Sequence, residues 1–522
     1  MCEHGAVPDW TYHPLNPLAA AMLGRRRSQR AALRALATLT SLPGGARVVA
    51  RAFAHPRPPA QLAGRLGATV PVPVAYDAIR ALPVQGAEVI EVGPVRAADV
   101  PALRRATTGR RCTVLARVTD PAIAAQVAPY VDRVVTGAEA DLVRLVDPEV
   151  AAATAALDDP AVTVLATPGV LVSAGPGWFQ RVIEAETPTG PPDRLRDVAA
   201  DPRRWPAWLW GVLVGLGMAG AGVGAAAITL GPLLLWYDND YLGMHRENLL
   251  GINGHLPPFL QHDRITMAGT MVAIGVLYAG LAWGGIRHGW RWARDAYLVS
   301  GAVGFPTLFY FLVSGFLEPL HTAVAVLLFP MFVLAVRGRP AAPRWRLAAD
   351  GPEYLRRRAL TGQLLMIATG LGLLIGGAVV SVVGLTSVFV PTDLGYLGTD
   401  AGHLHAVNPR LMPFIAHDRA GFGGALMAAA LAVTLLSAWG WRRGAAWVWW
   451  SLALAAAAGF GPAVVVHFVI GYTDLVHLAP VYVGVVLTTV ALVLARPFLC
   501  ARAAGRPDPA TAAQESAISG SV

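Results

Sequence analysis

The sequence predicts an α/β N-terminal domain with parallel strands, followed by an all-α polytopic membrane domain with eight transmembrane helices in two parallel repeats. Residues before about position 202 contain no apolar run of the roughly 20 residues that cross a bilayer, whereas long apolar runs begin near Trp205. Within the apolar half, residues 256–264 read LPPFLQHDR and residues 411–419 read LMPFIAHDR. Polar and aromatic residues recur around both phrases at matching spacing, which indicates an internal duplication.

The composition predicts that much of the chain faces lipid. Of its 522 residues, 55% are hydrophobic and only 14% are charged, and the mean hydropathy is +0.49. The net charge of +9 comes entirely from arginine, because the chain contains no lysine, so lysine-dependent chemistry is excluded. The arginines flank apolar runs, so the expected partner is the lipid bilayer and not nucleic acid. Three scattered cysteines predict neither a disulfide framework nor a zinc ribbon.

Residues 1–60 predict an N-terminal helical region. The Leu- and Ala-rich stretch 18–53 is typical of one or two amphipathic helices, interrupted at Pro43, Gly44 and Gly45. Such helices either have a solvated polar face or lie on the membrane surface. No basic stretch followed by an apolar run opens the chain, so we expect no cleaved signal peptide and a cytosolic N-terminal domain.

Residues 61–200 predict the α/β domain, because five strand-like runs alternate with helical stretches. This alternation is typical of βα units and a parallel sheet, either open or closed into a barrel. A complete eightfold barrel uses eight strands in about 250 residues, so a TIM-barrel-like sheet here would be incomplete. The predicted strands are 70–76, 88–95, 112–118, 133–136 and 162–166.

Eight apolar runs after residue 205 are long enough to cross a bilayer, although the fourth is short. Repeat 1 (205–337) and repeat 2 (360–496) contain four each, with an Arg-rich linker at 338–359 and an expected disordered tail at 497–522. An even number of spans per repeat makes the repeats parallel. The predicted spans are 207–235, 266–286, 296–316, 322–336, 360–390, 420–441, 448–470 and 476–494.

The distribution of arginine predicts the orientation. Most arginines of the membrane half fall on the side of the N-terminal domain, and the opposite side has only Arg246, Arg264, Arg410 and Arg419. The positive-inside rule then gives a multi-pass protein of the cell membrane with the N-terminal domain and the C-terminus in the cytoplasm.

Polar residues that both repeats share form a candidate site on the outer face. The first loop of each repeat is expected to end in His-Asp-Arg just before the second span, and the third loop carries an acid three residues before a histidine. On a helix, this spacing places a carboxylate and an imidazole on one face, which suits a divalent metal or a proton relay. The candidate metal ligands are His262, Asp263, Glu318, His321, His417, Asp418, Asp474 and His477.

The same residues have structural explanations that the sequence leaves open. Asp263 and Asp418 occupy positions expected for helix N-caps, and Arg264 and Arg419 occupy positions expected for headgroup anchors. A contact with a proton or a quinone headgroup is a third interpretation. His467, inside the seventh span, has no histidine counterpart in repeat 1 and by itself does not indicate haem.

Three phrases of the α/β domain carry a family resemblance. Residues 62–77 read LAGRLGATVPVPVAYD, residues 86–95 read GAEVIEVGPV, and residues 173–183 read SAGPGWFQRVI. In this order they resemble the class 2, membrane-associated dihydroorotate dehydrogenases over about residues 15–190. The resemblance implies an FMN-binding TIM barrel that oxidises dihydroorotate in pyrimidine biosynthesis and passes electrons to membrane quinone. The residues that it places at the cofactor are Asp77, Gly93, Arg117, Gly175 and Gly177.

The chain departs from that family at functional positions. Ala78 stands where the family has one lysine, and Arg117 stands where it has another. An Asn-rich substrate loop and a Gly-Gly phosphate loop have no counterpart, and the sequence assigns no catalytic base. The expected function is therefore an integral membrane protein with a degenerate dihydroorotate dehydrogenase-like domain. The alternatives are an active FMN-dependent oxidoreductase, and a transporter or sensor that uses the outer His and acid residues under regulation by the cytoplasmic domain.

Overall fold

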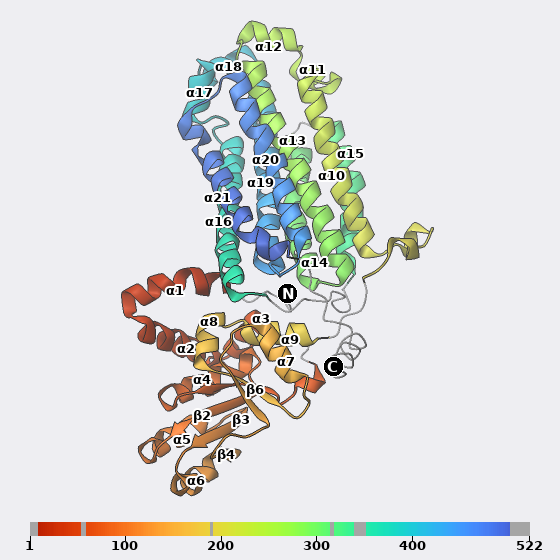
Figure 1. Cartoon of the computed structure of the whole chain (residues 1–522). Coiled ribbons are helices and arrows are strands. Elements are labelled where there is room, and N and C mark those ends of the chain that lie inside the picture. Colours follow the sequence, from red (N-terminus) through yellow and green to blue (C-terminus); the bar gives the residue numbers. More distant parts are fainter. Residues whose placement is uncertain (1–8, 54–58, 188–191, 314–317, 339–350, 502–522) are drawn as a thin grey trace, which may run out of the picture.

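The computed structural model describes residues 9–53, 59–187, 192–313, 318–338 and 351–501, and it places an α/β domain at one end of a helical bundle (Figure 1). The predicted tail after residue 501 and residues 339–350 of the predicted linker lie outside the described residues.

The described part of the α/β domain contains a six-stranded, fully parallel sheet of order β4-β3-β2-β1-β6-β5. Arg144 Nη2 in β5 donates to Glu91 Oε1 in β2 at 2.7 Å. Because β1 and β6 lie between these two strands, the contact shows that the sheet is strongly curled. β4 and β5 remain its two edges, which makes it an open half-barrel. This confirms the prediction of an incomplete parallel barrel. The strands are β1 (Leu66–Val70), β2 (Val89–Val95), β3 (Thr113–Val118), β4 (Arg133–Val135), β5 (Leu142–Leu145) and β6 (Thr163–Ala166).

One strand prediction was wrong, and the strand β5 was missed. The predicted strand 70–76 is not formed, because β1 ends at Val70 and is followed by a 3-10 turn and then by α4. Pro71 and Pro73 lack the backbone N–H groups that a central strand needs. β5 was missed because it has only four residues and carries Arg144, which points to the concave face beside Glu91.

Helices cover the convex face of the sheet and connect it to the bundle. The predicted break at 43–45 is confirmed, because α2 ends at Ser41 and α3 begins at Gly45, after Gly44 with a φ of 78°. The helices are α1 (Asp9–Leu23), α2 (Arg25–Ser41), α3 (Gly45–Phe53), α4 (Ala75–Ala81), α5 (Val100–Thr107), α6 (Pro121–Val127), α7 (Val150–Leu157), α8 (Pro168–Ala174) and α9 (Trp178–Glu186).

Seven helices within the described residues are long and apolar enough to cross a membrane, so the chain is a multi-pass membrane protein. α14 (Arg291–Val313) is an additional 23-residue helix that packs between α15 and α19. The seven are α10 (Ala207–Leu230), α13 (Leu256–Gly280, continued by turns to His288), α15 (Pro319–Arg337), α16 (Glu353–Leu385), α19 (Leu411–Gly440), α20 (Ala446–Ile470) and α21 (Leu475–Leu499).

The helices correspond in pairs across the two repeats: α10 with α16, α13 with α19, α14 with α20, and α15 with α21. Short helices α11 (Trp236–Leu242) and α12 (Arg246–Ile252) correspond to α17 (Pro391–Leu397) and α18 (Ala401–Val407), and all four lie at the end of the bundle far from the α/β domain (Figure 1). Asn253 Nδ2 donates to Leu397 O at 2.7 Å, and Asn408 Nδ2 donates to Leu242 O at 2.9 Å. Reciprocal contacts of this kind indicate a pseudo-two-fold axis, and because the equivalent short helices lie at the same end of the bundle, this axis runs along the bundle and the repeats are parallel.

The predicted starts of the second and sixth spans were wrong. α13 begins at Leu256 and α19 at Leu411, so both His-Asp-Arg triplets lie inside long helices and not in the preceding loops. Sequence hydropathy places charged residues outside a span, but here the charges neutralise one another inside the bundle.

The first turn of α16 docks into the α/β domain. Arg356 Nη1 donates to Asp9 Oδ2 at 2.9 Å, its Nη2 donates to Ala174 O at 2.5 Å, and its Nε donates to Glu353 Oε2 at 2.8 Å. Asp9, Glu353 and Arg356 are all buried, and Arg181 Nη1 lies 3.7 Å from Glu353 Oε2, so this contact joins the two parts of the chain through a buried network of two carboxylates and two arginines.

Candidate metal centre

Two crossed ion pairs join the central helices α13 and α19. Arg264 Nε lies 2.8 Å from Asp418 Oδ2, and Arg419 Nε lies 3.1 Å from Asp263 Oδ2. All four side chains are buried, so each charge depends on its partner from the other repeat. The interpretation of Asp263 and Asp418 as helix N-caps is wrong, because His255 and Arg410 hold the N-cap positions of α13 and α19. The interpretation of Arg264 and Arg419 as headgroup anchors is also wrong, because both side chains are buried and each is paired with a carboxylate.

Each of these arginines also binds a strained backbone carbonyl. Arg264 Nη1 donates to Leu233 O at 2.7 Å, and Arg419 Nη1 donates to Val388 O at 2.8 Å. Leu233 and Val388 have φ values of 66° and 64°, a conformation that bulky L-residues rarely adopt. The repetition of this strain at matched positions indicates that the fold maintains it to aim both carbonyls at the arginines.

The acids Asp238 and Asp393, at the starts of α11 and α17, differ in how firmly they are held. Arg419 Nη1 lies 2.6 Å from Asp393 Oδ2, whereas Arg264 Nη1 lies 3.4 Å from Asp238 Oδ2. Burial opposes ionisation of both carboxyls. Arg419 outweighs burial and lowers the pKa of Asp393, whereas burial prevails and raises the pKa of Asp238.

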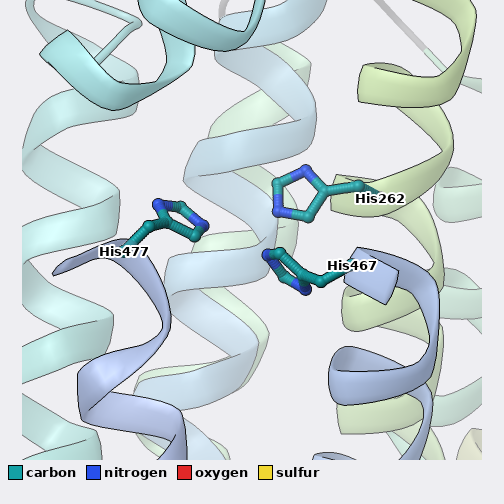
Figure 2. A group of neighbouring side chains, drawn as sticks. All are labelled: His262, His467 and His477. Carbon is teal, nitrogen blue, oxygen red and sulfur yellow. The ribbon is translucent and has the colours of Figure 1, made fainter. Parts of the chain in front are cut away.

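Three histidines converge beside the crossed ion pairs. His262 of α13, His467 of α20 and His477 of α21 each turn a ring nitrogen toward a common point (Figure 2), and the candidate ligand atoms lie within 4.8 Å of one another. The ring centroids of His262 and His467 are 4.5 Å apart, and those of His467 and His477 are 5.2 Å apart. His262 and His467 are buried, and His477 is partly buried.

The Nδ1 atom of each histidine faces an oxygen, which leaves Nε2 for the shared point. His467 Nδ1 lies 2.6 Å from Ala463 O, and His262 Nδ1 lies 3.3 Å from both Phe259 O and Asp263 Oδ1. His477 Nδ1 lies 3.2 Å from the hydroxyl of Tyr472, which in turn donates to Asp393 Oδ1 at 2.9 Å. Metal-binding histidines characteristically donate the other ring N–H to such an oxygen.

A second cluster occupies the matched position in the other half. Glu318 and His321, at the start of α15, meet His417 of α19, and their candidate ligand atoms also lie within 4.8 Å of one another. Glu318 contacts His321 directly, and its Oε2 lies 3.7 Å from His417 Nε2. The two clusters are not copies, because a carboxylate takes part in the second where His467 takes part in the first.

The predicted ligands therefore separate into three groups. His262 and His477 belong to the three-histidine site, whereas Glu318, His321 and His417 belong to the second cluster. Asp263 and Asp418 bind arginines, and Asp474 lies outside both clusters, where it caps α21 by accepting the N–H of His477 at 2.8 Å. Sequence comparison of the repeats missed His467, because no histidine matches it, and missed Tyr472, which holds His477. Asp393, which accepts the hydroxyl of Tyr472, was not among the predicted site residues either.

The residues that the family resemblance places at a flavin have other partners here. Gly177 N–H donates to Asp9 Oδ1 at 3.0 Å, and a side chain on Gly175 would meet His13 Nε2 at 2.9 Å. The turn therefore holds a carboxylate of the chain where a phosphate would have to lie, and it does not fit the flavin phosphate.

The other predicted flavin residues are likewise engaged. Arg117 Nε lies 3.6 Å from Glu91 Oε1, and a side chain on Gly93 would meet Arg117 O at 2.7 Å. Asp77 Oδ2 lies 3.7 Å from Nε of Arg34 in α2. These contacts give no support to the predictions of FMN and quinone, which stay predictions.

Comparisons with protein-family models, with curated proteins and with solved structures find no match for this chain.

Proposed function

We propose that this protein is a membrane-embedded metal-binding protein whose centre is the site formed by His262, His467 and His477. The observation that carries the proposal is the shared orientation of the three imidazoles. Each has an oxygen at Nδ1, and His467 Nε2 is buried without a hydrogen-bond partner among the described residues. Burying an imidazole nitrogen in this way costs free energy unless something binds it.

The donor set favours a borderline transition metal. Three neutral imidazoles suit Zn²⁺, copper, nickel or iron, and three protein ligands leave a further position for water or a substrate. Arg419 already neutralises the nearest acid, because its Nε lies 3.1 Å from Asp263 Oδ2. The site therefore offers a bound cation three neutral imidazoles and little negative charge. Hard cations such as Ca²⁺ and Mg²⁺, which prefer oxygen ligands, do not fit this site.

Metal binding by the purified protein tests the proposal. We expect equilibrium dialysis of the detergent-purified full chain against Zn²⁺ to show tight binding that His467→Ala weakens by at least tenfold. His405→Ala, which alters an exposed histidine on α18, is the matched control and should bind as the unaltered protein does. Binding that is insensitive to His467→Ala and also to the combined change of His262 and His477 to alanine would refute the proposal.

We further propose a sensor in which α16 connects the metal centre to the α/β domain. At one end of α16, Gly384 packs on Arg419, because a side chain there would meet Arg419 Cβ at 3.0 Å. At the other end Arg356 is bound by Asp9. One helix thus contacts both the ion-pair network beside the histidines and the docked domain. In this proposal the α/β domain is a degenerate dehydrogenase-like module that responds to the membrane site.

The proposed topology has eight spans, with α14 as the eighth and the α/β domain in the cytoplasm. The arginine-rich helix ends support this orientation, since Arg287, Arg294 and Arg442 all lie at the end of the bundle that meets the α/β domain. In a chain without its native cysteines, we expect a membrane-impermeant maleimide to label His403→Cys in intact cells and Arg203→Cys only after lysis. The opposite labelling, or a reporter after Val522 that reads as external, would contradict the topology.

A further inference from the structure

A pocket beside the second cluster opens between α10 and α15 near the end of the bundle that holds α11. Its volume is about 280 Å³. The polar side chains of its lining, here called the polar end, include Tyr237, Asp238, Glu318, His321 and Asp418. The apolar part of its lining includes Ile228, Leu320 and Val324. A smaller cavity of about 40 Å³ shares Met267 and Met271 with it and continues toward Tyr278.

The apolar part of the pocket exists because α10 has glycines where a helix in lipid usually has large side chains. A side chain on Gly220 or Gly224 would meet no atom within 4 Å, so both positions border open space. Repeat 2 carries Ile375 and Val379 at the matched positions of α16. The space is therefore a property of repeat 1 and does not follow from the duplication.

The polar end contains an unsatisfied acceptor. Asp238 is 2% exposed, and its Oδ2 accepts the N–H of Leu235 at 3.0 Å, but its Oδ1 has no hydrogen-bond partner within the described part of the chain. The matched Asp393 differs, because its Oδ1 accepts the hydroxyl of Tyr472. The sequence counterpart of Tyr472 in repeat 1 is Phe316, which has no hydroxyl group. The nearby hydroxyl of Tyr237 donates to Glu318 Oε1 at 3.0 Å. A buried carboxylate oxygen without a donor is costly.

We propose that this pocket binds a lipid-soluble molecule with a hydroxyl head group, which donates to Asp238 Oδ1 while its apolar tail lies between α10 and α15. The pocket offers the head group of a ligand more hydrogen-bond acceptors than donors, because the donors of Arg264 are already shared between Asp238 and Asp418. The apolar wall and the membrane position select a ligand that partitions into the bilayer. This site is separate from the three-histidine site, so the proposal stands or fails independently of metal binding.

Saturation binding of radiolabelled 4-decylphenol to the full chain in lipid nanodiscs tests the proposal, with 4-decylanisole as the matched ligand that lacks the donor. We expect the phenol to bind at least about tenfold more tightly than its methyl ether, as expected for one hydrogen bond to a buried carboxylate. Asp238→Asn should reduce this difference. Gly224→Leu should abolish binding of both compounds by filling the pocket.

Gly372→Leu is the control, because Gly372 is exposed on α16 and a side chain there also meets no atom within 4 Å. It should bind 4-decylphenol as the unaltered protein does. Equal affinity for the phenol and the ether would overturn the proposed role of Asp238. Unchanged binding in Gly224→Leu would overturn the pocket, and tighter binding of decylammonium than of 4-decylphenol would overturn the hydroxyl head group.

Discussion

Arg419 is the residue on which most of the buried ion-pair network beside the three histidines depends. It binds Asp263, Asp393 and the carbonyl of Val388, so replacing it leaves two buried carboxylates without their cation. Removing one member of a buried ion pair costs about 3–5 kcal/mol. Because the pair of Arg419 with Asp263 joins the two repeats, its loss should also weaken the packing of one repeat against the other.

We therefore expect Arg419→Met to lower the free energy of unfolding by about 3–5 kcal/mol, measured by denaturant titration in detergent. Asp263→Asn should cost less, because Arg419 keeps Asp393. Arg410→Met, which alters an exposed arginine at the end of the same bundle, is the control and should change stability by less than about 1 kcal/mol. Equal losses in Arg419→Met and Arg410→Met would show that the crossed pairs do not stabilise the fold.

Tyr472 positions His477 and should therefore tune the metal site without being a ligand. Burial raises the pKa of Tyr472, so the phenol stays protonated, donates to Asp393 and accepts from His477 Nδ1–H. Tyr472→Phe should weaken Zn²⁺ binding by about 10–100-fold, as for other residues that orient a metal ligand. Tyr354→Phe, at an exposed tyrosine, is the control. Unchanged affinity in Tyr472→Phe would remove this role.

His13 gives the contact between the two parts of the chain a predicted pH dependence. Burial and the neighbouring Arg356 lower the pKa of His13 from 6.5 to about 4. Between these values the unfolded chain binds a proton at His13 that the folded chain excludes. The free energy of unfolding therefore falls by up to about 3 kcal/mol as the pH drops from about 6.5 to 4. Above pH 6.5 the titration of His13 leaves it unchanged. Thermal unfolding of the α/β domain should show this fall. His13→Gln should abolish it, and an identical pH profile in both proteins would contradict the prediction.

The residues of the site could be predicted only in part. Aligning the two copies identified His262, His417, His321 and His477, because both copies keep them. It could not predict which of them meet, since equivalence between repeats is not proximity: the pseudo-two-fold axis brings His262 to His477 of the other repeat. His467 and the pocket at Gly224 arise where the repeats have diverged, so a search for shared residues passes over them.

At the scale of the elements, helices of one repeat approach each other through small residues. A side chain on Gly222 would meet Ala268 O at 2.7 Å, and one on the matched Gly377 would meet Gly423 O at 2.8 Å. These contacts hold α10 against α13 and α16 against α19 at backbone distance, as small residues do in membrane helices. The same packing recurs in both repeats, which shows that the duplication preserved it.

Gly377→Val should therefore separate α16 from α19 and lower the free energy of unfolding by about 1–3 kcal/mol or more. Gly376→Val is a matched control one residue away, because a side chain on Gly376 meets no atom within 4 Å. Denaturant titration of both variants measures the difference. A Gly376→Val loss as large as that of Gly377→Val would contradict the close approach of these helices.

Helix positions followed from hydropathy, but helix starts did not. α20 and α21 lie close to the predicted spans 448–470 and 476–494, because their ends are marked by polar residues. α13 and α19 begin well before the predicted 266 and 420, since hydropathy counts each charge alone and does not register that Arg264 and Asp418 neutralise each other. In the α/β domain the same limit hid β5, whose Arg144 is paired with Glu91.

For the whole molecule, the chain combines a duplicated bundle with an open half-barrel docked on α16 (Figure 1). The sequence predicted both parts and their order, because composition changes sharply at Trp205. It did not predict the docking, which depends on Asp9 and Arg356, residues separated by most of the chain. The proposed sensor function rests on this connection and on occupancy of the three-histidine site.

The most direct test of the account is X-ray absorption by Zn²⁺ bound to the full chain. One equivalent should be loaded into a His321→Ala background, which disables the second cluster. The account predicts three imidazole nitrogens at roughly 2.0–2.1 Å and loss of one of them in His321→Ala with His467→Ala. A zinc shell made only of oxygen, or a spectrum that His467→Ala leaves unchanged, would contradict the assignment of His262, His467 and His477 as the metal centre.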